Sequence, residues 1–332
     1  MMQKNIILIF IIISMMVSSC DFKKPEPKRP ETESNVKINL PEFNSDSAYN
    51  FVEKQVLFGP RVPNTTAHEK CAEYLAKKLG QFSDTVIVQN AKLKAWNGTL
   101  LNSFNIIGSF NVNQKNRVLL FAHWDSRPYA DQEEDAELMK KPIDGASDGA
   151  SGVGVLLEIA RVLSENNPNI GVDIIFFDAE DYGKPSYIED ESIQNDWCLG
   201  TQYWCKNPHV KNYTAKYGIL LDMVGAKNAI FALEGTSMYF ASDVMIKTWD
   251  IANDLGYSDY FKYIETGNLT DDHLYVNQMA NIPSIDIIQY DPNSNRYFAA
   301  YWHTHNDKMD IIDKNTLKAV GQTVIGVLFS EK

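Results

Sequence analysis

From residue 118 onward, short strand-like runs alternate with longer helix-like runs, and this alternation constrains the fold more than any other feature. The strand-like runs cover residues 118–122, 172–177, 217–221 and 283–288. The helix-like runs cover residues 153–163, 199–206, 240–255 and 316–329. Strands that alternate with helices form a mainly parallel sheet covered on both faces. We therefore expect an α/β fold, a three-layer α/β/α sandwich around a mostly parallel, mixed central sheet.

The segment before residue 118 predicts two helices and a hairpin. Residues 47–57 and 68–79 carry apolar side chains at helical spacing. A strand begins at Thr85, and the turn-forming residues 96–99 lead into a second strand at 104–108. These elements belong to the same domain, because no second linker interrupts the chain.

The N-terminus has the pattern of an export signal. Lys4 precedes an apolar run at 6–17, which is shorter than the roughly 20 residues that span a bilayer, and small residues follow. Cys20, directly after Ser18 and Ser19, resembles the lipobox of bacterial lipoproteins. That resemblance implies a lipidated Cys20 and a membrane-anchored protein of the bacterial cell envelope, facing the periplasm or the cell surface. The alternative is an ordinary signal peptide with a coincidental cysteine.

Composition divides the chain into three parts. We expect a signal peptide at 1–19, a lipidated tether at 20–45 that is rich in Lys, Pro and Glu, and one catalytic domain at 46–332. The net charge of −12 argues against nucleic acid as a partner, since phosphate binding needs clustered Lys and Arg. The four cysteines indicate neither a disulfide framework nor a cysteine metal site. The oligomeric state is left open.

Acids and histidines follow each predicted strand, where ligands bind in such sheets. They are His123 and Asp125 after the first strand, Asp178, Glu180 and Asp181 after the second, Asp222 after the third, and a loop reaching Trp302, His303, Thr304 and His305 after the last. Each residue alone is a weak signal, but their joint placement at one edge predicts a common site.

Asp148 lies among small residues at the start of the helix at 153–163. We expect it to be exposed and to bind a cation, although an isolated Asp there is usually a helix N-cap. Histidine and carboxylate ligands suit zinc. Of the adjacent acids Glu180 and Asp181, one can bind the metal while the other serves as general acid/base.

Five motifs, at 123–126, 144–152, 177–181, 221–223 and 302–304, resemble those of the zinc aminopeptidase-like superfamily, in the same order. Within it the chain is most similar to the animal-type glutaminyl cyclases (glutaminyl-peptide cyclotransferases), which occur also in some bacteria. Trp302 directly before His303, Phe298 five residues before it, and the sequence Asp271-Asp272-His273 support that choice.

The resemblance implies a zinc-exopeptidase-like fold and zinc-dependent cyclisation of N-terminal glutamine, with release of ammonia, on peptide or protein substrates. It implies one zinc held by Asp148, Asp181 and His303. It further implies that Glu180 transfers the proton, that Asp222 and Asp271 complete its network, and that Trp302 and Phe298 wall the substrate pocket.

Two other functions remain open. The first is a zinc aminopeptidase of the same fold, in which His123 and Asp222 hold a second zinc. The second is a binding or scaffold lipoprotein with an inactive site. The charged segment 131–141 is expected to be a solvated loop near the pocket mouth. We do not expect His273 or His305 to contact the metal.

Overall fold

The computed structural model describes residues 40–331. The predicted signal peptide, Cys20 and residues 20–39 of the predicted tether lie outside the described residues. The last six tether residues, 40–45, belong instead to the packed domain. Phe43 is buried against helix α7 (Lys314–Ser330), and its N–H donates to Gln322 Oε1 over 3.0 Å.

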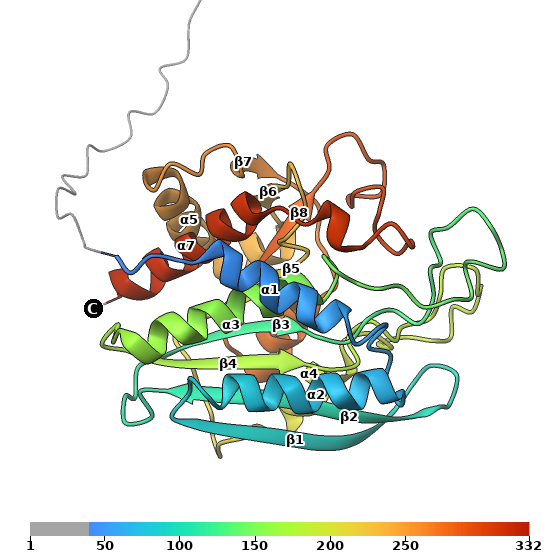
Figure 1. The fold of residues 1–332 in the computed structure, drawn as a ribbon, viewed down its shortest axis with the longest axis horizontal. Helices are drawn as coiled ribbons and strands as arrows, with labels where there is room; N and C mark the ends of the chain where they lie inside the picture. The colour runs from blue at the N-terminus through green and yellow to red at the C-terminus, as the bar shows by residue number, and fades with distance from the viewer. Residues whose placement is uncertain (1–39, 332) are drawn as a thin grey trace, which may run out of the picture. The chain divides into compact units, whose positions relative to one another are not determined.

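One eight-stranded sheet organises the domain, in the order β1-β2-β4-β3-β5-β8-β6-β7 (Figure 1). The strands are β1 (Thr85–Lys94), β2 (Leu100–Phe110), β3 (Arg117–His123), β4 (Gly171–Phe177), β5 (Gly218–Asp222), β6 (Ile230–Leu233), β7 (Phe261–Glu265) and β8 (Ser284–Tyr290). The central strands β4, β3, β5 and β8 are parallel neighbours, whereas β1–β2, β2–β4 and β6–β8 pair antiparallel. The predicted mostly parallel, mixed sheet is confirmed.

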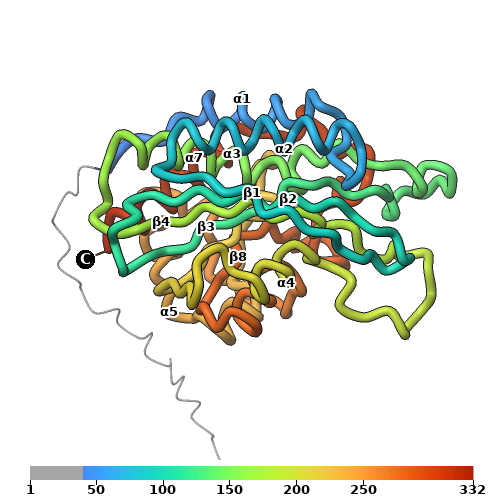
Figure 2. Tube along the Cα trace, turned by 90° about the horizontal axis from the view of Figure 1, so that it is seen from below, coloured from blue at the N-terminus to red at the C-terminus, as the bar shows by residue number. Residues whose placement is uncertain are grey.

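Helices cover both faces of the sheet, as expected for a three-layer sandwich. Helices α1 (Ser45–Val56), α2 (Thr66–Leu79), α3 (Ala150–Glu165) and α7 lie on one face (Figure 2). Helix α4 (Leu199–Lys206), α6 (Asp272–Tyr275) and the π-helix η1 (Val276–Ala280) lie on the other. Within β3, Leu120 joins the first core and Leu119 and Phe121 join the second, because successive strand residues point to opposite faces.

The remaining elements complete the far end of the sheet. Helix α5 (Gly235–Asp254) packs against β8 and α7, and a short 3₁₀ helix, η2 (Met309–Ile311), precedes α7. The backbone of α5 leaves helical geometry at Ala241 (φ −147°), which divides α5 into two helical segments. The helix predicted at residues 240–255 corresponds to the second of these segments. Strands β6 and β7 escaped prediction because one has four residues and the other is mostly exposed. Within residues 40–331 no helix combines the length and apolarity needed to cross a membrane.

Candidate metal centre and active site

The carboxyl ends of three parallel strands bring the predicted site residues together. His123 ends β3 and Asp222 ends β5, while Glu180 and Asp181 follow the end of β4. Because these strands are parallel neighbours, with His123 paired to Phe177, their ends meet at one edge. The strand order alone therefore gathers residues from three separate segments of the chain.

Asp148 reaches this edge from the loop before α3, and it is buried rather than exposed as predicted, with 3% of its surface accessible. Its N–H donates to Asp307 Oδ2 over 3.0 Å. Gly149 next to it has φ 94°, and a Cβ there would lie 2.5 Å from the Asp125 carbonyl oxygen and 3.0 Å from the His123 ring. A glycine thus lets the loop close onto β3, which removes Asp148 from solvent.

Asp148, Asp181 and His303 form a cluster suited to a metal ion. His303 Nε2 lies 3.6 Å from Asp148 Oδ2 and 3.5 Å from Asp181 Oδ1. Asp181 Oδ2 is buried and has no hydrogen-bond partner among the described residues. An unpartnered buried carboxylate oxygen is costly unless a cation binds it. One nitrogen and two carboxylates are a ligand set that zinc accepts, with room for substrate in an open position.

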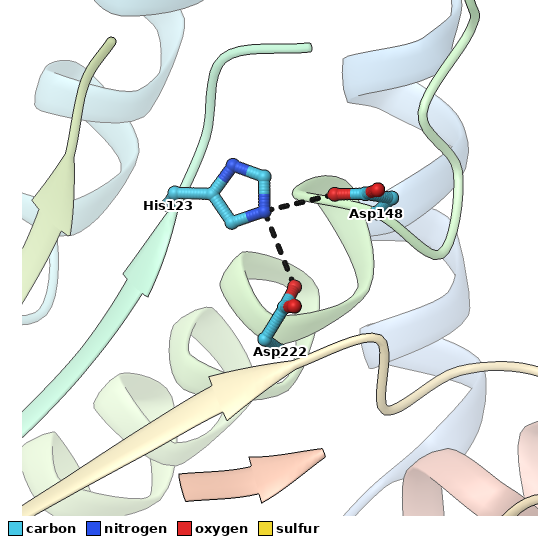
Figure 3. Close-up of side chains that lie close together, drawn as sticks. All are labelled: His123, Asp148 and Asp222. Atoms are coloured by element: carbon cyan, nitrogen blue, oxygen red, sulfur yellow. Dashed lines mark hydrogen bonds and ion pairs between the residues drawn. The ribbon is translucent and has the colours of Figure 1, made fainter. Parts of the chain in front are cut away.

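His123, Asp148 and Asp222 form a second cluster that could hold a metal ion (Figure 3). Its Nε2 lies 3.1 Å from Asp148 Oδ1 and 3.2 Å from Asp222 Oδ1. Burial lowers the pKa of His123, but the surrounding carboxylates Asp125, Asp148 and Asp222 outweigh burial and hold it well above its usual range. Asp148 therefore directs one oxygen to each histidine and is shared by the two clusters.

Glu180 occupies a turn that separates its side chain from that of Asp181. Ala179 adopts a left-handed backbone (φ 54°), and the N–H groups of Glu180 and Asp181 donate to the two oxygens of Asp125, over 3.1 and 3.2 Å. Burial, then the neighbouring carboxylates Asp271 and Asp181, raise the pKa of Glu180 well above its usual range. A carboxyl group in this state can both accept and return a proton.

Cys198 contacts Glu180 and was missed by the sequence analysis. Its Sγ donates to Glu180 Oε1 over 3.3 Å, and its backbone N–H donates to the Glu180 carbonyl oxygen over 2.9 Å. No cysteine metal motif marks this residue in the sequence. Only the return of the chain at residues 182–197 brings it beside Glu180.

All eight residues that the resemblance assigned to the site line one cavity of about 150 Å³. They are Asp148, Glu180, Asp181, Asp222, Asp271, Phe298, Trp302 and His303. The ring of Trp302 stacks on His303 at 3.8 Å between centroids and lies 4.4 Å from the Phe298 ring.

Trp197 adds a further aromatic wall that the sequence analysis did not single out. Its ring is nearly parallel to that of His303, at 6.2 Å and 10°. Its only sequence signal was an aromatic residue beside a helix start. Three aromatic side chains, Trp197, Phe298 and Trp302, therefore line the cavity around the proposed metal cluster.

The prediction that residues 131–141 form a solvated loop is only partly correct. Glu134 and Glu137 are exposed as expected, but Asp131 is buried beside His303, so the segment is not a solvated loop throughout. His273 and His305, which were not expected to contact the metal, lie outside the His303 cluster. His305 Nδ1 lies 2.9 Å from Glu133, and His273 Nε2 lies 3.1 Å from Glu234.

A family model described as peptidase family M28 matches residues 105–328, which include every predicted ligand. The chain belongs to peptidase family M28. Within this family, it is similar to a solved Zn-dependent exopeptidase from Parabacteroides distasonis (56% identity, TM-score 0.87, 88% of this chain and 100% of that one).

Two further relatives carry the name that the motifs suggested. One is a solved Bacteroides thetaiotaomicron glutaminyl cyclase bound to N-acetylhistamine (53% identity, TM-score 0.87, 89% of this chain and 100% of that one). The other is a Drosophila melanogaster glutaminyl-peptide cyclotransferase, 24% identical over 280 residues, which cover 77% of this chain and 73% of the relative. The predicted likeness to glutaminyl cyclases with a zinc-exopeptidase-like fold is confirmed.

Proposed function

We propose that this M28 protein cyclises the N-terminal glutamine of peptides and proteins to pyroglutamate and releases ammonia. One observation carries the proposal. A histidine–carboxylate metal cluster and the carboxyl group of Glu180 share a small cavity walled by Trp197, Phe298 and Trp302. The likeness to proteins named glutaminyl cyclase supports the same reaction.

The chemistry requires a nucleophilic amine, an activated amide and a proton carrier. A zinc ion held by Asp148, Asp181 and His303 would supply Lewis-acid polarisation of the side-chain amide carbonyl of the glutamine. The α-amino nitrogen forms a bond to the side-chain amide carbon, Cδ, while Glu180 takes a proton from that nitrogen. Glu180 then returns the proton to the side-chain nitrogen, whose bond to Cδ breaks as ammonia departs.

Asp271 and the aromatic walls of the cavity assist this proton transfer. Asp271 offers a carboxylate oxygen within 4.8 Å of Glu180, and burial followed by Asp222 and Asp272 raises the pKa of Asp271 well above its usual range. A network of protonated and ionised carboxyl groups can hold the transferred proton near Glu180. The aromatic walls exclude water, which would otherwise hydrolyse the activated amide.

We propose one zinc per chain, at the His303 cluster. There the histidine lies 3.5–3.6 Å from the carboxylates and Asp181 Oδ2 is unpartnered, so donor atoms are free for a cation. In the other cluster His123 Nε2 is already hydrogen-bonded to Asp222 over 3.2 Å. Elemental analysis of the purified protein for zinc per chain tests this count.

The presence of the second cluster, His123, Asp148 and Asp222, favours the second candidate function, a zinc aminopeptidase with two metals. One assay separates the two functions. The protein is incubated with a Gln-initiated peptide, and mass spectrometry follows the products. Loss of one ammonia from an otherwise intact peptide supports the cyclase, whereas release of free glutamine supports the aminopeptidase. A peptide that remains unchanged would contradict both.

The cellular location is proposed from the N-terminal sequence alone. We propose that residues 1–19 are a signal peptide, that Cys20 is lipidated, and that residues 20–39 tether the domain to a bacterial envelope membrane. Cys20→Ser should abolish incorporation of labelled fatty acid and release the protein from membranes. Incorporation that persists in this variant would contradict the assignment.

A further inference from the structure

Asp131 is an acidic residue of a charged surface segment that nevertheless lies buried beside the cavity, with 3% of its surface accessible. A buried carboxylate is costly unless it is paired and hydrogen-bonded. Its contacts therefore indicate why the chain places it there.

Three segments of the chain converge on Asp131. Arg127 donates to both of its oxygens, from Nε to Oδ1 and from Nη2 to Oδ2, each over 2.8 Å. Ser186 donates its N–H to Oδ2 over 2.7 Å and its hydroxyl to the Asp131 carbonyl over 2.9 Å. His303 Nδ1 lies 3.1 Å from Oδ1 as an ion-pair contact, and this buried nitrogen has no hydrogen-bond partner among the described residues.

The backbone strengthens the link to His303. The N–H of Gln132 donates to the His303 carbonyl oxygen over 3.2 Å. His303 itself has a left-handed backbone (φ 54°), a conformation that a non-glycine residue keeps only when its surroundings impose it. Both the main chain and the ring of His303 therefore depend on residues 131 and 132.

Arg127 extends the arrangement to a second proposed ligand. Its Nη1 donates to the Asp181 carbonyl oxygen over 3.0 Å and to Asp181 Oδ1 over 3.2 Å. Its guanidinium lies 4.6 Å from the centroid of the Trp197 ring, which is stacked over His303. One buried Asp–Arg pair thus contacts two of the three residues of the cluster.

We propose that Asp131 is a positioning residue for the metal site: it holds His303 with Nδ1 directed at its own carboxylate and Nε2 directed at Asp148 and Asp181. A carboxylate at one ring nitrogen fixes the proton there, which leaves the other nitrogen free to bind metal and raises its basicity. Through Arg127, Asp131 also holds the carboxylate of Asp181. The inference deepens the proposed function, since it rests on the assignment of His303 and Asp181 as ligands.

The chain contains a matched control for this proposal. Glu133, two residues away, lies 2.9 Å from Nδ1 of His305 and also accepts the His305 N–H over 2.8 Å. This pair reproduces the carboxylate–imidazole contact in the same segment, but His305 belongs to no metal cluster among residues 40–331. Glu133→Gln therefore removes the same kind of charge without touching a proposed ligand.

The test measures zinc affinity rather than activity alone. Wild-type protein, Asp131→Asn and Glu133→Gln are stripped of metal, and the zinc dissociation constant is determined by competition with a chelator. We expect Asp131→Asn to bind zinc roughly 10–100-fold more weakly, the usual effect of removing such a partner, and Glu133→Gln to match wild type. Thermal unfolding of the metal-free forms verifies that each variant is folded, and Asp131→Ala, which also removes the carboxylate, replaces Asp131→Asn if that variant fails to fold.

The outcomes separate this inference from the proposed function. Wild-type affinity in the Asp131 variant, or an equal loss in Glu133→Gln, would overturn the positioning role. Glutamine cyclisation is measured on the same preparations. A wild-type protein that binds zinc in an Asp131-dependent way but leaves Gln-initiated peptides unchanged would refute the proposed function while supporting the role of Asp131.

Discussion

Replacing Glu180 by Gln tests the proton-transfer role with the smallest possible change in shape. The backbone bonds of residue 180 to Asp125 and Cys198 do not involve its side chain, and the amide oxygen can still accept from the Cys198 thiol. The variant loses only the ability to take up and return a proton. The fold and the Asp148–Asp181–His303 cluster should therefore remain in place.

General acid–base catalysis contributes about 10²–10⁴-fold to an enzymatic rate. In the Glu180→Gln variant, the carboxyl group of Asp271 remains in the same cavity, near the reacting atoms. We therefore expect kcat to fall by about 10³-fold, the middle of that range, which corresponds to about 4 kcal/mol of transition-state stabilisation. Initial rates of pyroglutamate formation give kcat, zinc analysis shows whether the metal is retained, and Glu133→Gln is the matched control. A zinc-loaded Glu180→Gln variant with more than a tenth of the wild-type kcat would refute the assignment.

The same variant should not lose stability in the metal-free protein. Burial, followed by Asp271 and Asp181, raises the pKa of Glu180 well above its usual range, so between the unfolded and folded pKa the folded state holds a proton that the unfolded state releases. The free energy of unfolding of the wild type therefore decreases as pH rises through that window. Gln does not titrate, so we expect metal-free Glu180→Gln to be at least as stable as wild type at pH 8 in urea unfolding. A clear loss of stability there would contradict the electrostatic argument.

Three further predictions concern the metal, a buried acid and the packing beneath the site. Removing zinc with a chelator should lower Tm, and zinc restored at about 100 times its Kd should return about 2.7 kcal/mol; identical melting curves would argue against a metal in the native state. Burial raises the pKa of Asp272 to about 7, so the wild type should lose stability as pH rises towards 7. Asp272→Asn removes the titrating group, so this variant should lose less stability over that range and should be more stable than wild type at pH 8 in the metal-free form. Urea unfolding at several pH values measures both effects. Gly152→Ala would place a Cβ 2.0 Å from the Leu221 carbonyl oxygen and should cost about 1–3 kcal/mol, whereas Gly267→Ala, with nothing within 4 Å, should unfold at the wild-type urea concentration.

The predicted fold and the strand-end residues were recoverable from the sequence because they depend on local patterns. Strand runs such as 118–122 lie within the observed β3, and the acids that follow strands must lie at the carboxyl edge of a parallel sheet. Predictions failed where a loop path decides the environment. Asp148 was expected to be exposed and Asp131 solvated, yet both are buried. Their burial depends on loops that close over the sheet edge, and no local pattern encodes that closure.

The sequence by itself determined the α/β class, the edge of the sheet that carries the site, and the residue types that converge there. The periodicity of apolar residues selects strands and helices, and the parallel arrangement that follows brings the strand ends together. Only the tertiary structure decided that Asp148 divides its two oxygens between His123 and His303. It also decided that Cys198 donates to Glu180 and that Asp131 supports His303. These contacts join segments distant in the chain, and their geometry depends on how the loops pack rather than on any local propensity.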